Sequence, residues 1–149
     1  MKIEDAIKTK TFEDPAIRAL VNIDYTSSWI YGIRNEILGP LDFSIQQYNI
    51  LRILRGQYPK AVTVKFLIER MVDKNSNASR LVDKLYNKGL IDRNQCEKDR
   101  RQVDVKINEK GLAMIEILTE ALMSQRERFN NLSSSEFEQL SELLDKLRG

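Results

Sequence analysis

The sequence changes its hydrophobic period between residues 75 and 107, and this change constrains the fold most strongly. Residues 75–88 carry apolar side chains at helical spacing, which predicts an amphipathic helix. The residues expected on its buried face are Ala78, Leu81, Val82 and Leu85. Gly89 is expected to end the helix, because glycine readily adopts the left-handed conformation found there. Residues 90–93 then become extended, and Val103, Val105 and Ile107 alternate with polar residues, so a helix leading into a β-hairpin is predicted.

Local start signals place further helices on both sides of this unit. The residues expected to cap them are Asp14, Ser44, Thr63, Asn108 and Ser133. The first helix spans residues 14–38 and ends at Gly39, whereas the long helix after the hairpin reaches residue 131. Ser133 and Glu136 form a capping box that opens a last helix over residues 133–148.

Two short helices joined by a tight turn and followed by a hairpin are typical of a winged helix-turn-helix. The predicted fold class is therefore mainly α with a small β-hairpin, with a winged helix-turn-helix core over residues 41–110.

The composition argues against several classes of protein. The chain has 149 residues, no histidine and a single cysteine. The absence of histidine removes the usual general base and the commonest zinc ligand, so we expect no enzyme, no cofactor and no metal. One cysteine allows no internal disulfide and fits a reducing cytoplasm. Neither a signal peptide nor an 18-residue apolar run is present, so a cytoplasmic protein without a membrane span is expected.

Positive charge is concentrated in the middle of the chain. The whole chain carries a formal charge of +2, but residues 74–110 alone carry +4 and residues 111–149 carry −3. Any contact with nucleic acid is therefore expected in the middle segment.

The helix over residues 75–88 is the candidate for reading DNA bases. Its exposed residues are Asn75, Ser76, Asn77, Ser79, Arg80 and Lys84. Asparagine can pair with adenine and arginine with guanine, and small polar residues let the backbone approach the base edges. The alternative is that these residues are only helix caps and solvated surface.

The predicted hairpin carries a charged tip. Lys98, Arg100 and Arg101 suit DNA backbone or a narrow minor groove, where arginine is favoured. Asp99 is placed to hold the Arg101 guanidinium through a charge-assisted hydrogen bond. The alternative is a basic turn that contacts only solvent.

Between residues 62 and 111 the chain resembles the MarR family of transcriptional regulators. The resemblance rests on V-T-V-K-F-L-I-E-R-M-V-D-K-N-S, on S-N-A-S-R-L-V-D-K-L-Y-N-K-G-L-I-D-R and on D-R-R-Q-V-D-V-K-I-N-E-K-G, in that order. It implies that Asp99 and Arg101 fill the wing positions and that Arg101 contacts the minor groove. The departures lie around the turn, where Phe66, Ile68, Val72 and Asp73 replace residues frequent in the family.

The resemblance implies a single MarR-like domain over residues 1–149 that binds a palindromic operator as a homodimer and acts as a repressor. Dimerisation helices are expected at residues 14–38 and 110–148, because they carry more apolar surface than a small monomer needs. Twofold symmetry would place two recognition helices ~34–36 Å apart. The predicted DNA-binding residues are Lys65, Asn75, Ser76, Asn77, Ser79, Arg80, Lys84, Lys98, Asp99, Arg100 and Arg101, of which Lys65, Lys84, Lys98 and Arg100 are expected on phosphates.

The sequence leaves three alternatives open. Relatives of this family are often released from DNA by a small aromatic or phenolic effector, and the aromatic residues near the first two helices, with Arg34, suit one. They are Tyr25, Trp29, Tyr31, Phe43 and Tyr48, and an ordinary role in the core or interface is the favoured interpretation. Cys96 would suit a redox-responsive regulator, although an inert thiol is favoured because Glu97 and Asp99 oppose a lowered thiol pKa. A winged helix can also serve as a protein-interaction module without sequence-specific DNA binding.

Overall fold

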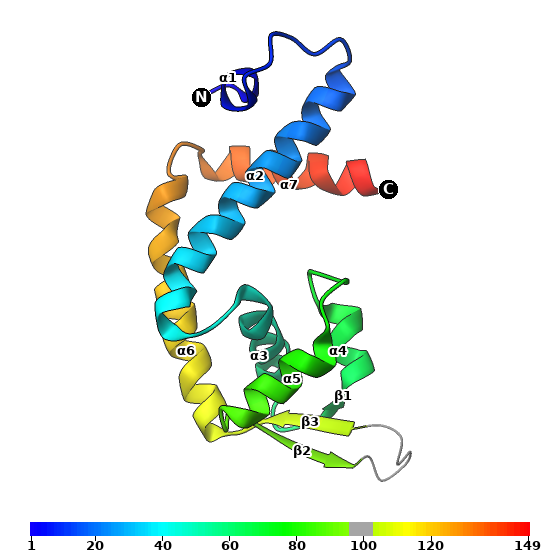
Figure 1. Cartoon of the computed structure of the whole chain (residues 1–149), viewed down its shortest axis with the longest axis vertical. Coiled ribbons are helices and arrows are strands. Elements are labelled where there is room, and N and C mark those ends of the chain that lie inside the picture. Colours follow the sequence, from blue (N-terminus) through cyan, green and yellow to red (C-terminus); the bar gives the residue numbers. More distant parts are fainter. Residues whose placement is uncertain (96–102) are drawn as a thin grey trace.

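The computed structural model describes residues 1–95 and 103–149 and contains mostly helices with one small sheet (Figure 1). In chain order the elements are α1 (Ile3–Ile7), α2 (Pro15–Leu38), the 3-10 helix η1 (Gly39–Leu41), α3 (Ile45–Gln57), β1 (Val62–Thr63), α4 (Val64–Arg70), α5 (Ala78–Asn87), β2 (Ile91–Gln95), β3 (Val103–Ile107), α6 (Glu109–Met123), the 3-10 helix η2 (Ser124–Phe129) and α7 (Ser134–Arg148). The predicted fold class is confirmed.

The expected caps begin their helices. Ser44 Oγ accepts a hydrogen bond from the Gln47 amide at 3.2 Å, and Gln47 Oε1 accepts one from the Ser44 amide at 2.9 Å, which completes a capping box. Asn108 Oδ1 caps α6, and Ser133 forms the expected capping box with Glu136. Each cap satisfies amides that the first helical turn leaves without partners, which fixes where the helix begins.

The sheet has three antiparallel strands in the order β1-β3-β2, so the prediction of a two-stranded hairpin was incomplete. Val62 pairs with Val105 on the far edge of the hairpin. Two residues are too few to show the alternating hydrophobic pattern of a strand, so β1 can be recognised only from its pairing with β3.

We call α3, α4, α5, α6 and the sheet the winged-helix body, because one continuous core joins them. Leu51, Leu67, Leu85, Ile107 and Ile115 are completely buried and come from all three helices around the sheet, from β3 and from α6. The core therefore lies between the helices and the inner face of the hairpin.

Two other boundaries differ from those expected. The helix predicted to reach residue 131 ends at Met123 and continues as the tighter η2. At the N-terminus, α1 was not predicted; Ile3 is buried there and Arg18 of α2 pairs with Glu4 at 2.5 Å.

The terminal helices α2 and α7 extend away from the winged-helix body (Figure 1). No residue of α7 is buried, and α2 buries only Ile33 and Leu38 near its C-terminal end. Both helices leave large apolar side chains in solvent. These are Ile17, Leu20, Phe137, Leu140, Leu143 and Leu147, which are 43–64% exposed.

A close contact joins the start of α6 to the turn between α5 and β2. A Cβ added to Gly111 would lie 2.1 Å from the Leu90 carbonyl oxygen, so only glycine fits without movement. The Leu90 oxygen also accepts a hydrogen bond from the Asn108 amide at 3.2 Å. The start of α6 is thus held against the Leu90 carbonyl, in the turn between α5 and β2.

Candidate nucleic-acid interface

Helices α4 and α5 are set by a turn over residues 71–77 that is held by side-chain hydrogen bonds. Thr63 caps α4 through the Phe66 amide at 3.2 Å. Asp73 accepts from the Asn75 amide at 3.0 Å and from Ser76 Oγ at 2.7 Å. These two hydrogen bonds, the Ser76 hydroxyl first, hold the pKa of the Asp73 carboxyl below its ordinary range.

The helix predicted over residues 75–88 begins later than expected. Asn77 is the N-cap, and its Oδ1 accepts from the Arg80 amide at 3.0 Å, so α5 starts at Ala78. Asn75 and Ser76 belong to the turn instead, because both donate hydrogen bonds to the Asp73 carboxylate and lie N-terminal to the cap residue Asn77. The Ser76 hydroxyl donates to Asp73, and the Asn77 oxygen serves as a cap.

The two faces of α5 are divided as predicted. Ala78, Val82 and Leu85 are buried against the body, whereas Leu81 is only half-buried. Ser79, Arg80 and Lys84 are exposed. Within residues 1–95 and 103–149 the side chains of Arg80 and Lys84 form no hydrogen bond or ion pair, although the charge of Lys84 helps to lower the pKa of the Asp42 carboxyl.

The remaining predicted residues divide into two groups. Lys65 is exposed in the first turn of α4, and Asn75 is exposed in the turn before α5. Lys98, Asp99, Arg100 and Arg101 of the predicted wing lie outside the described residues, as does Cys96.

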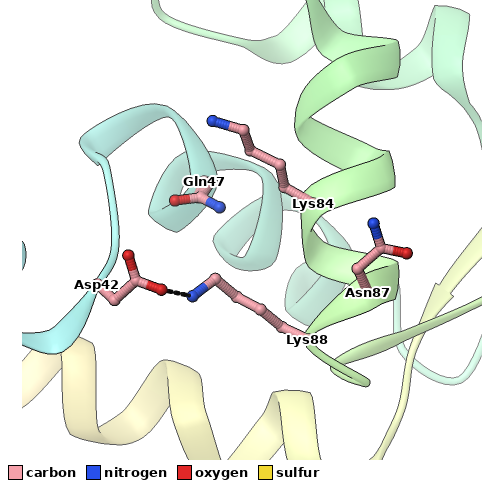
Figure 2. Close-up of a pocket in the computed structure, with 5 residues that line it drawn as sticks. All are labelled: Asp42, Gln47, Lys84, Asn87 and Lys88. Carbon is pink, nitrogen blue, oxygen red and sulfur yellow. Dashed lines mark hydrogen bonds and ion pairs between the residues drawn. The ribbon is translucent and has the colours of Figure 1, made fainter.

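A shallow pocket of about 370 Å³ lies between the start of α3 and the second half of α5 (Figure 2). Its lining residues are Asp42, Gln47, Lys84, Asn87 and Lys88. Lys88 forms an ion pair with Asp42, which lowers the pKa of the Asp42 carboxyl, and its ammonium lies 4.7 Å from the centre of the Phe43 ring. Lys88 therefore ties the C-terminal end of α5 to the segment that precedes α3, whereas Lys84 forms no ion pair among the described residues and affects Asp42 only through its charge.

One group at this surface was missed in the sequence. Arg93 of β2 pairs with Asp83 of α5, and its guanidinium lies 4.2 Å from the centre of the Tyr86 ring. Asp83 is the single acidic residue of α5. That isolated negative charge beside Arg80 and Lys84 is the sequence signal that could have indicated a positively charged partner.

Three of the five aromatic residues considered for an effector pack against different partners. Trp29 packs edge-on against Phe129 with ring centres 5.5 Å apart. Phe43 is buried beneath Lys88. The Tyr48 hydroxyl lies 3.4 Å from the Thr119 hydroxyl. These rings serve three separate packing contacts.

No helix within 1–95 or 103–149 is long and apolar enough to cross a membrane. In the same part of the chain, no three histidine, cysteine, aspartate or glutamate side chains gather as metal ligands would.

The comparisons with known proteins agree with this geometry. Residues 43–103 match the sequence model of the MarR family. The HTH-type transcriptional regulator PecS of Dickeya dadantii is 24% identical over 115 residues, which cover 76% of this chain and 69% of PecS. A MarR transcription factor from Planctomyces limnophilus is 28% identical, with a TM-score of 0.71 over 91% of this chain and 98% of the other.

A third relative was solved as a DNA complex. A MarR variant from E. coli bound to operator DNA is 27% identical, with a TM-score of 0.74 over 92% of this chain and 99% of the other.

Proposed function

Because residues 43–103 match the sequence model of the MarR family and the chain has a winged helix-turn-helix fold, we propose that it is a sequence-specific regulator that binds duplex DNA as a homodimer and represses transcription. The observation that carries the proposal is α5, which buries one face against the body and presents cations and small polar side chains on the other. A helix of this kind docks in the major groove while the adjacent hairpin reaches the neighbouring groove.

In the proposed complex, phosphate contacts position the protein and base contacts specify the sequence. Lys65 and Lys84 contact phosphates, together with Lys98 and Arg100 of the wing. Ser76, Asn77, Ser79 and Arg80 face the bases. The Asn77 amide nitrogen is the group available for donation, since its oxygen already accepts from the Arg80 amide.

The homodimer is supported by the terminal helices. Helix α7 exposes Phe137, Leu140, Leu143 and Leu147, with no covering element among the described residues. Apolar area of this extent is normally covered in a stable protein, and a second copy of the chain would cover it by twofold symmetry. Two recognition helices would then face successive turns of a palindromic site.

The decisive experiment is selection of bound sequences from a random duplex pool, followed by titration at several salt concentrations. We expect a palindromic site and an affinity that falls steeply with salt, because each phosphate contact releases counterions. A chain that serves only as a protein-interaction module would enrich no sequence and show no salt-dependent binding.

Arg80→Ala is expected to weaken binding to the selected site by about 1–3 kcal/mol and to relax specificity at one base position. Arg126→Ala removes the same charge from an exposed position in η2 and is the matched control. Equal affinities of the two variants would exclude Arg80 from base recognition.

Arg101→Ala tests the wing assignment that follows from the family resemblance. We expect weaker binding, with the loss confined to contacts beside the recognition helix. Response to an aromatic effector stays a prediction, tested by adding simple phenols and benzoates to the same titration.

A further inference from the structure

Arg93 lies where the sheet would be expected to place an apolar residue. Directly opposed residues of antiparallel strands point to the same face, and Arg93 is paired with Val105. Val105 is completely buried on the inner face, as is Ile107, whose partner Ile91 is 1% exposed. Arg93 therefore starts on the inner face of the hairpin, the face covered by the helices.

Its side chain reaches α5 and makes two contacts there. The guanidinium forms an ion pair with Asp83 and lies over the Tyr86 ring, 4.2 Å from its centre. Asp83 and Tyr86 are three residues apart, so they are neighbours on the helix surface. One arginine is thus held by charge and by stacking at once, and this geometry restrains its orientation more than a single surface ion pair would.

The connection behind this contact is short and well defined. Gly89 has a φ of 70°, and the Gly89 and Leu90 amides bond back to the carbonyls of Tyr86 and Leu85 at 2.8 and 3.1 Å. This is the Schellman geometry that ends a helix. The turn fixes one end of the hairpin to α5, and Arg93, four residues beyond Gly89, adds a second fixed point.

The same contact changes the charge that α5 presents. Asp83 lies on the exposed side of the helix with Arg80 and Lys84, and its side chain is 58% exposed. An unpaired carboxylate there would repel the phosphates of a duplex in the groove. Arg93 neutralises that charge without covering the neighbouring cations.

We propose that Arg93 is a positioning residue for DNA recognition, which fixes the angle of the hairpin against α5 and masks the Asp83 carboxylate from the phosphate backbone. This inference rests on the proposed function. It adds to that function a reason why the recognition helix and the wing would reach one duplex together.

A charge-matched set of variants separates the two roles. Arg93→Gln leaves Asp83 unmasked, whereas Asp83→Asn combined with Arg93→Gln has the same net charge as the wild type but no ion pair. We expect the double variant to bind the selected duplex about fivefold more weakly than the wild type, and Arg93→Gln alone to be weaker still. Tyr86→Leu removes the stacking partner and keeps both charges, so a smaller loss in the same direction is expected.

Measuring the affinities at several salt concentrations distinguishes the masking role of Arg93 from its positioning role. The difference between Arg93→Gln and the double variant should shrink as salt rises, because it is electrostatic, while the loss in the double variant should persist. The matched control is Glu116→Gln combined with Arg55→Gln, which removes another exposed ion pair between α3 and α6 and should leave affinity unchanged. Wild-type affinity in the double variant would overturn the positioning role. Equal affinities of Arg93→Gln and the double variant would overturn the masking role.

A measurement without DNA keeps the inference separate from the proposed function. Amide hydrogen exchange in β2 should be faster in the double variant than in the wild type, with unchanged exchange in α3. If the wild type enriches no duplex, the proposed function fails, and the exchange result still decides whether Arg93 fixes the hairpin. Unchanged exchange in β2 would overturn that part as well.

Discussion

The winged-helix body and the terminal helices α2 and α7 bury their apolar side chains in different ways. The body encloses Leu51, Leu67 and Leu85 completely within one chain. Helix α7 has a capping box and regular apolar spacing, yet none of its residues is buried. The body thus covers its own core, whereas the terminal helices leave large apolar side chains exposed, as expected if the proposed dimer forms.

The largest effect should come from a cavity in the body. Leu85→Ala removes a completely buried side chain and is expected to lower the free energy of unfolding by ~2–5 kcal/mol. Leu143→Ala makes the same chemical change in α7, where the side chain is 64% exposed, and should cost less than ~0.5 kcal/mol in the monomer. Urea unfolding at low protein concentration measures both, and similar losses would show that the two regions do not differ as described.

Glycine-to-alanine substitutions compare how closely the backbone is packed in the body and in α2. Gly111→Ala must push the added Cβ against the Leu90 carbonyl and Ile107, and should destabilise the chain by ~1–3 kcal/mol. Gly32→Ala in α2 meets no atom within 4 Å and should instead stabilise by up to ~1 kcal/mol, since alanine favours the helix. Thermal unfolding of both variants should move in opposite directions.

A charge placed on α7 should affect assembly more than folding. Leu143→Asp is expected to weaken self-association at least tenfold, because a carboxylate would be buried in the proposed dimer interface. Val72→Asp is the control, since Val72 is 81% exposed in the turn of the body. Sedimentation equilibrium gives the dissociation constants, and equal constants for the two variants would place the interface elsewhere.

The smallest effect concerns acid stability. The pKa of Asp73 is lowered in the folded chain, so its contribution is present above its ordinary value of 3.8 and is lost as pH falls through the folded value. Asp73→Asn should therefore lose less stability than the wild type as the pH falls from about 5 to below 3.8. Asp24→Asn in α2 removes an exposed carboxylate as a control. Denaturation midpoints measured across this pH interval test the expectation. Equal losses of stability in Asp73→Asn and the wild type would contradict it.

Features set by a few neighbouring residues could be predicted from the sequence. Ser44, Thr63, Asn108 and Ser133 each cap the helix that they were expected to cap. Each cap is a contact across three residues, which a short motif specifies fully. The buried face of α5 was also predicted, because helical periodicity repeats over its length.

Features that depend on a distant partner could not be predicted in the same way. The two residues of β1 become a strand only by pairing with β3. Asn75 and Ser76 were assigned to α5, although Asp73 holds them in the turn. The isolated Asp83 indicates that a partner exists, but the pairing with Arg93 depends on how β2 packs against α5, so the sequence spacing between them does not identify it.

The dimensions of α2 have a mechanical consequence. Its 24 residues make a rod ~36 Å long, joined to the winged-helix body near one end. If α2 tilts by about 5° about its N-terminal end, its C-terminal end, which contacts the body, moves by about 3 Å. That displacement is close to the ~3.4 Å rise of one base pair along a DNA strand. In the proposed complex with DNA, a tilt of that size would therefore displace the winged-helix body by about one base-pair step.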